Sequence, residues 1–110
     1  MPMQQVLLQF YTLGKRKVRG TPIRDWLLEC AERVGIAGGT TFRAQAGYGH
    51  DKAQQGENVV EVGADYPFEV EFATDKAHAD RLIEMVKAEN IRIFYVCIPV
   101  EFGWLGQSGE

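Results

Sequence analysis

Residues 21–46, TPIRDWLLECAERVGIAGGTTFRAQA, contain a helix pattern and a strand pattern joined by a glycine-rich junction. Thr21 and Pro22 predict the helix start, with threonine as the N-cap and proline at the first helical position. Gly35 predicts the end of the helix, because glycine readily adopts the left-handed conformation found there. Residues 40–46 begin with residues of high β-strand propensity and alternate along the chain, which predicts a strand. The helix has the apolar spacing i, i+3, i+4, i+7 of an amphipathic segment: Ile23, Trp26, Leu27, Cys30 and Val34.

The segments before this unit predict one more strand. Residues 4–13 are apolar and aromatic, as is typical of a strand. Residues 14–20 are basic and bounded by glycines, which predicts a loop. The chain therefore begins with a strand, a loop and a helix.

The segments after this unit predict two strands and a helix. Residues 58–72 predict a third strand with a bulge or break at 63–67. Thr74 or Asp75 caps a second amphipathic helix, and residues 91–100 predict the fourth strand. The order strand, helix, strand, strand, helix, strand is the ferredoxin-like βαββαβ pattern. We therefore expect an α+β fold, a four-stranded antiparallel sheet with two helices on one face.

The fourth predicted strand is apolar on both faces. Two helices cover only one face of a sheet, so a second apolar face needs another cover. Another copy of the chain would supply it, and the alternative is a central strand shielded by the C-terminal tail. The alternating residues are Ile91, Ile93, Tyr95 and Cys97 on one side, and Phe94, Val96 and Ile98 on the other.

Composition limits the classes of function. The chain has 110 residues, enough for one compact domain, and 45% of them are apolar. Its 12 Lys and Arg stand against 15 Asp and Glu, a formal charge of -3, which argues against a nucleic-acid partner. No apolar run reaches the roughly 20 residues that span a bilayer, and the N-terminus has no basic signal-peptide region. Cys30 and Cys97 are isolated from each other in the sequence, and we interpret both as buried free thiols. Free thiols are typical of reducing compartments, so we expect a cytoplasmic protein.

The sequence offers few places for an anion. Arginine binds phosphate through a planar fork, so Arg43 and Arg92 are candidates, although such arginines are commonly solvated or paired with carboxylates. Arg19, in the basic cluster 15–19 and close to the predicted helix start, is a third candidate. Gly47 and Gly49 could bring backbone N–H groups to an anion, or simply form a turn. His50 is a candidate contact or an ordinary surface histidine.

No residue pattern indicates catalysis. No nucleophile has a visible base, so we expect no enzyme and no catalytic residues. Glu61, Asp65, Glu69 and Glu71 form an acidic series that could bind a divalent metal, but a solvated strand face is the simpler interpretation. Trp104 in the tail could seal a subunit interface or merely lie on its surface.

Residues 20–50, GTPIRDWLLECAERVGIAGGTTFRAQAGYGH, resemble the PII-like proteins, relatives of the nitrogen regulatory PII proteins. The resemblance rests on the Gly-x-Pro opening of the helix, the Gly-Ile-Ala-Gly-Gly-Thr junction and the Gly-Tyr-Gly-His that follows. Asp65-Tyr66-Pro67 also fits, and the likeness extends from the first to the fourth strand. It implies a PII-like domain over 1–103, with 104–110 as a tail.

The resemblance implies a homotrimeric signalling protein. In PII proteins small effectors, typically adenine nucleotides, bind in clefts between subunits. The T-loop changes shape with the effector and engages a partner, often a membrane transporter or an enzyme. In this chain the T-loop matches 47–58, with Gly47, Tyr48 and Gly49 at its base and His50 in the PII-like variant of the motif.

Two features depart from the PII pattern. The segment 87–92 lacks the glycines of the phosphate-binding turn before the last strand, which puts a backbone cradle for a triphosphate in doubt. The loop 47–58 is shorter than a PII T-loop and, beyond Tyr48, lacks the tyrosine that some PII proteins modify. Two other classes therefore stay open. One is a CutA-like trimer that binds divalent metal through His50 and the acidic strand, and the other is an interaction subunit with no ligand.

Overall fold

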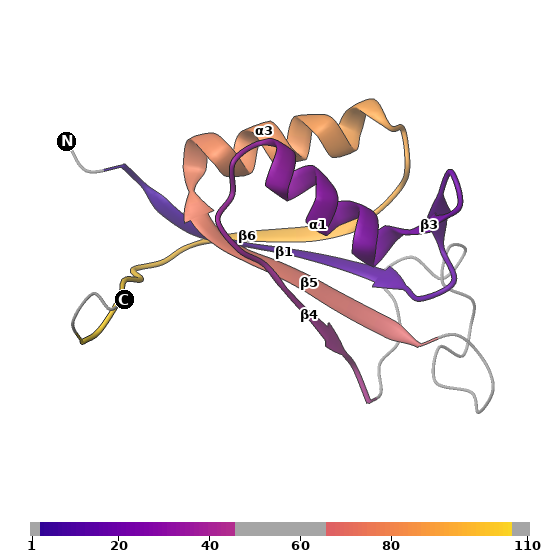
Figure 1. Cartoon of the computed structure of the whole chain (residues 1–110), viewed down its shortest axis with the longest axis horizontal. Coiled ribbons are helices and arrows are strands. Elements are labelled where there is room, and N and C mark those ends of the chain that lie inside the picture. Colours follow the sequence, from indigo (N-terminus) through magenta and orange to yellow (C-terminus); the bar gives the residue numbers. More distant parts are fainter. Residues whose placement is uncertain (1–2, 46–65, 107–110) are drawn as a thin grey trace.

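The computed structural model describes residues 3–45 and 66–106, and their elements follow the order of the ferredoxin-like fold (Figure 1). Four strands form one antiparallel sheet: β1 (Gln5–Leu13), β4 (Thr40–Arg43), β5 (Pro67–Asp75) and β6 (Phe94–Pro99). The order across the sheet is β4-β5-β1-β6, so the two long strands occupy its centre. The helices α1 (Ile23–Arg33) and α3 (Lys76–Ala88) cover the same face (Figure 1). The predicted fold class is confirmed.

The core lies between this sheet face and the two helices. Every second residue of β1 and β5 points toward the helices, as the two-residue period of a strand requires. Each fully buried Leu, Val or Phe contributes roughly 1.5–3 kcal/mol through the apolar surface that it removes from water. The core includes Val6, Leu8, Phe10, Val70 and Phe72 from the strands, Trp26, Leu27 and Cys30 from α1, and Ala79, Leu82 and Val86 from α3.

The start of α1 differs from the prediction. The helix begins at Ile23, with Pro22 as an N-cap that makes no side-chain capping hydrogen bond. Thr21 is not the cap, because Thr21–Pro22 form the short strand β3, which pairs with β2 (Lys17–Val18). Part of the predicted basic loop is therefore a hairpin. Its two turn residues, Arg19 and Gly20, have φ of 48° and 84°, as the tight turn of a two-residue hairpin requires.

The ends of α3 are defined by polar side chains. Asp75 is the N-cap, as predicted, and its carboxylate accepts a hydrogen bond from the backbone N–H of His78 at 2.8 Å. Asn90 follows the helix with a φ of 61°, a left-handed conformation that asparagine tolerates better than most residues. The glycine-free turn before the last strand therefore closes α3 through an asparagine.

Three of the four strands of the sheet differ in length or position from the predicted strands. The first strand agrees to within one residue, whereas β4 ends at Arg43 and not at residue 46. The third strand continues to Asp75, and its predicted first part, with the break up to residue 65, lies outside the described residues. The last strand begins only at Phe94, because residues 91–93 lead into it from α3.

The last strand lies at the edge of the sheet, so a central position for it is wrong. The predicted division of its faces is confirmed by its register with β1. Tyr95 lies opposite the buried Phe10, while Phe94 lies opposite Tyr11 on the other face. Within the described residues that other face carries no helix, and Phe42, Phe94 and Ile98 are exposed on it. Neither described helix is long and apolar enough to cross a membrane.

Candidate functional site

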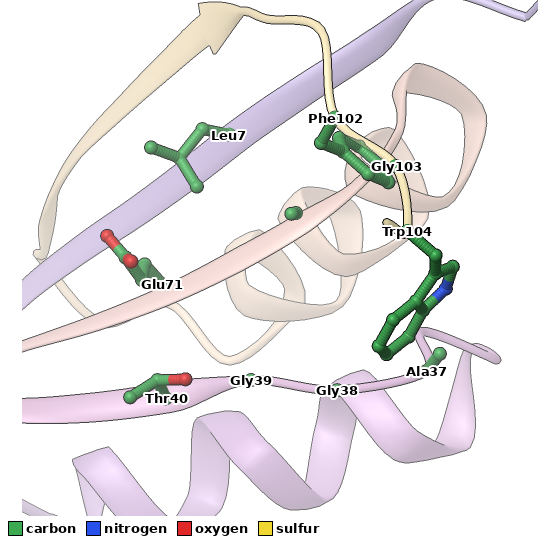
Figure 2. Close-up of a pocket in the computed structure, with 10 residues that line it drawn as sticks. Leu7, Ala37, Gly38, Gly39, Thr40, Glu71, Phe102, Gly103 and Trp104 are labelled. Atoms are coloured by element: carbon green, nitrogen blue, oxygen red, sulfur yellow. The ribbon is translucent and has the colours of Figure 1, made fainter. Parts of the chain in front are cut away.

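The uncovered sheet face contains a cavity of about 580 Å³ near the start of β4 (Figure 2). This volume lies in the range of small-molecule sites, roughly 300–1,000 Å³. The floor comes from the sheet, one wall from the junction between α1 and β4, and the other wall from the C-terminal tail. The lining residues are Leu7, Ala37, Gly38, Gly39, Thr40, Glu71, Ala73, Phe102, Gly103 and Trp104.

Gly39 allows the junction wall to lie directly on the sheet. A Cβ at this position would come within 2.4 Å of Cε1 of Phe72 and 3.1 Å of Cδ2 of Leu28. A Cβ at Gly38 would meet nothing within 4 Å. The two adjacent glycines therefore have different roles: Gly39 permits the close approach, and Gly38 leaves open space.

The tail wall is held by one side chain of β1. The Gln5 amide donates to the carbonyl of Phe102 at 3.3 Å and accepts from its backbone N–H at 3.2 Å. The backbone N–H of Val100 donates to the carbonyl of Gln5 at 3.1 Å. These bonds place Trp104 at the mouth of the cavity, and its exposed fraction is 98%. In Figure 2 its indole ring extends from the tail toward Ala37.

Glu71, which lines the cavity, shares a hydrogen-bond donor with Glu69, which lies outside the lining. The Gln9 amide donates to Oε2 of Glu69 at 2.9 Å and to Oε1 of Glu71 at 3.2 Å. The Tyr11 hydroxyl donates to Oε1 of Gln9 at 3.3 Å, which orients the amide nitrogen toward both carboxyl groups. Partial burial raises the pKa of Glu69, and its hydrogen-bond contact with Glu71 and the charge of that group raise the pKa further. Burial, with the two neighbouring carboxylates, also raises the pKa of Tyr11.

Arg43 does not belong to this cavity. It lies opposite Phe68 in the β4–β5 register, whereas Thr40 lies opposite Glu71, so the two β4 side chains point to opposite faces. The Arg43 guanidinium lies 3.8 Å from the ring centroid of Tyr66, which is a cation–π contact.

Arg19 and Arg92 also lie outside the cavity lining. Arg19 was predicted to lie close to the N-terminus of α1, but α1 begins only at Ile23. The Arg19 guanidinium instead pairs with the carboxylate of Glu89, at the end of α3. The hairpin turn is thereby joined to the turn that leads toward the exposed Arg92. The remaining predicted site residues, Gly47, Tyr48, Gly49 and His50, and the loop 47–58 lie outside the described residues.

The cavity as a site was missed from the sequence. The glycine pair at the junction was the one sequence feature that could have indicated it, because both glycines line the cavity. In the sequence analysis this pair supports the family resemblance only. The floor residues could not be found, because Leu7 and Ala73 join the site only through strand pairing. Among residues 3–45 and 66–106, no three His, Cys, Asp or Glu side chains are grouped so that they could hold a metal ion.

Comparison with known proteins gives two findings that agree with each other. Residues 5–101 match the model of the DUF190 family, described as "Uncharacterized ACR, COG1993". The chain is also 30% identical over 88 residues to a "UPF0166 protein" of Aquifex aeolicus (strain VF5), an alignment that covers 80% of this chain and 84% of that protein. The family match includes every strand and helix of the described fold, so this chain belongs to the DUF190 family.

Proposed function

We propose that this chain is a PII-like, non-enzymatic signalling protein that assembles as a homotrimer and binds an anionic effector, an adenine nucleotide, in clefts between subunits. The effector-bound state engages a regulated partner, such as a membrane transporter or an enzyme, through the loop 47–58. The observation that carries this proposal is the cavity on the uncovered sheet face, with its wall at the glycine-rich junction.

The chemistry of the cavity suits the neutral end of a nucleotide. Leu7 and Ala73 offer an apolar floor, and Thr40 and Glu71 offer polar groups at one side. A carboxylate accepts hydrogen bonds from the amino group of a base or the hydroxyl groups of a ribose. The base and sugar therefore fit these side chains better than a phosphate does.

The phosphate end needs a cation that the cavity lining does not contain. In a trimer, an arginine of a neighbouring copy would face the effector, and Arg92 and Arg43 are the candidates of this chain. The backbone N–H groups of Gly47 and Gly49 would add donors. An effector held by both groups would favour one state of the loop 47–58, and only that state would fit the partner.

Self-association is supported by the apolar side chains on the uncovered face. Phe42, Phe94 and Ile98 are 49%, 37% and 39% exposed, and they lie on the same face as the cavity. A neighbouring copy on this face would bury them and close the open side of the cavity.

The test is calorimetry with AMP, ADP, ATP and cyclic AMP, together with the mass in solution. We expect a trimer that binds at least one nucleotide with one site per chain. Ala73→Leu would fill the cavity floor and weaken binding at least tenfold, whereas Ala77→Leu, at an exposed position of α3, would leave binding unchanged. A monomer, or the absence of binding by all four nucleotides, would refute the proposal.

A further inference from the structure

The strongest unassigned feature is the indole of Trp104, which forms part of the cavity wall and yet is almost wholly exposed to solvent. Its exposed fraction is 98%, although the residue lines the cavity. Single exposed apolar side chains are common on protein surfaces, so exposure alone means little. Here the ring extends across the mouth of the cavity toward Ala37 on the opposite wall (Figure 2). Its position therefore offers a large aromatic surface to whatever enters the cavity.

The backbone holds this ring at the cavity mouth. Both hydrogen bonds of the Gln5 amide go to the backbone of Phe102, two residues before the indole. The backbone N–H of Val100 donates to the Gln5 carbonyl and fixes the same stretch of tail to β1. Only Gly103 separates the anchored residue from Trp104. The indole is thus tethered at short range, while its ring remains free to pack on a ligand.

The wall that faces the indole consists of backbone without side chains. A Cβ at Gly39 would point at the Phe72 ring in the core, on the side away from the cavity, and Gly38 also carries none. A group in the cavity can therefore approach this backbone closely. The floor below it is apolar, with Leu7 and Ala73. The cavity is a slot between an aromatic ring and bare backbone, a shape that suits a flat ring system.

We infer that Trp104 is the stacking residue of the site: the planar aromatic part of the ligand packs on the indole face and is enclosed by the backbone of Gly38 and Gly39. Aromatic rings prefer an offset stacked arrangement, and every nucleobase has a π-face. Thr40 and Glu71 lie at one side of the slot, where their oxygens accept hydrogen bonds from an amino group on the ring. For nucleotides this inference rests on the proposed function, because it names the residue that binds the base. The stacking itself does not require a phosphate.

A neighbouring copy of the chain is the alternative cover for the indole. It would bury the ring with or without a ligand, so loss of the ring would weaken assembly. Leu105 distinguishes the two cases, because it is the next residue and is equally exposed, at 98%, but does not line the cavity. The direction of the indole, across the cavity mouth, favours the ligand.

The first experiment measures binding by calorimetry with AMP, ADP, ATP and adenosine. The proteins are the full chain and its Trp104→Ala, Trp104→Phe and Leu105→Ala variants, and the mass of each in solution is measured alongside. We expect Trp104→Ala to weaken binding about 5- to 150-fold, the loss typical of one base–aromatic contact. Trp104→Phe should retain most of the affinity, since it keeps a ring, and Leu105→Ala should leave affinity unchanged. Adenosine reports the base alone, because it carries no phosphate.

The second experiment uses tryptophan fluorescence. The other tryptophan, Trp26, is buried in the core, so the difference between wild type and Trp104→Phe isolates the emission of Trp104. A base stacked on the indole quenches this emission. We expect saturable quenching in the wild type, with the same midpoint as calorimetry, and none in Trp104→Phe. Inorganic phosphate is the control ligand, and it should not quench.

The outcomes separate this inference from the proposed function. Equal nucleotide affinity in wild type and Trp104→Ala would overturn the stacking role and leave the proposed function standing. Loss of both affinity and mass in Trp104→Ala would assign the indole to a subunit interface and would also overturn it. Quenching of Trp104 by adenosine, with no binding of the three nucleotides, would support the stacking role and refute the proposed function. Neither binding nor quenching with any of the four compounds would refute both.

Discussion

Gly39→Ala should destabilise the fold although residue 39 is itself exposed. The new methyl carbon would lie 2.4 Å from Cε1 and 2.6 Å from Cδ1 of Phe72. Carbon atoms in contact prefer about 3.5–4.0 Å, so the methyl group lies roughly 1 Å too close to a ring. Phe72 is 1% exposed and packs edge-on against Phe10, with 6.4 Å between ring centroids. The ring cannot move away without disturbing the core.

The expected magnitude is the upper part of the range for an overpacked core, about 2–3 kcal/mol in the free energy of unfolding. A domain of this size would lose roughly 4–8 °C in Tm per kcal/mol. Gly38→Ala is the matched control, because its Cβ meets nothing within 4 Å and its φ does not lie in the left-handed region. The reduced freedom of the unfolded chain would make the control neutral or more stable by about 0.4–1 kcal/mol.

The assay is urea unfolding of wild type and both variants at one fixed protein concentration, because in a protein that self-associates the apparent stability depends on concentration. Phe72→Leu in the Gly39→Ala background tests the cause, since a smaller side chain removes the contact. The double mutant should then show less than the sum of the two single losses. If Gly39→Ala and Gly38→Ala unfold within about 0.5 kcal/mol of each other, the close approach does not constrain the junction.

Three further predictions concern the cap, the tail and the uncovered face. The hydrogen bond from the His78 backbone N–H holds the pKa of Asp75 below its usual value, so Asp75→Asn should lower the urea midpoint at pH 7. The difference between the two proteins should vanish as acid protonates Asp75. A difference that stays unchanged at pH 2–3 would contradict this. Gln5→Ala removes two hydrogen bonds to Phe102, so proteolysis after Phe102 should become faster and the fluorescence anisotropy of Trp104 should fall. An unchanged anisotropy would show that other contacts hold the tail. Phe94→Asp should reduce the mass of the assembly in solution without loss of far-ultraviolet circular dichroism. Arg81→Glu, at an exposed position of α3, should leave the mass unchanged. Equal masses for both variants would exclude the uncovered sheet face as the interface.

The elements that the sequence predicted well are those whose signal is local. The apolar periodicity of both helices and the Asp75 cap depend on residues within a few positions of each other. Thr21 and Pro22 show the limit of this approach, because the same pair suits a helix start or a short strand. The alternative chosen by the structure depends on Lys17 and Val18, which pair with them across a two-residue turn.

The cavity could not be predicted in the same way, because its walls come from distant parts of the chain. Leu7, Glu71 and Phe102 meet only after β1 has paired with β5 and the tail has bonded to Gln5. From the sequence, a solvated strand face is the simpler interpretation of the acidic series that includes Glu69 and Glu71. The structure instead brings them together under one amide, and this contact depends on the register that places Gln9 opposite Glu71.

The cavity and the exposed apolar side chains occupy the same face of the sheet, which has a thermodynamic consequence. A neighbouring copy that covers Phe42 and Phe94 would also change the surroundings of Glu71. If the effector and the copies both bind this face, each must alter the affinity for the other by the same factor. A nucleotide that strengthens assembly would then bind more tightly at high protein concentration. A nucleotide whose affinity is independent of concentration across the dissociation range would instead bind at a site that the neighbouring copy does not touch.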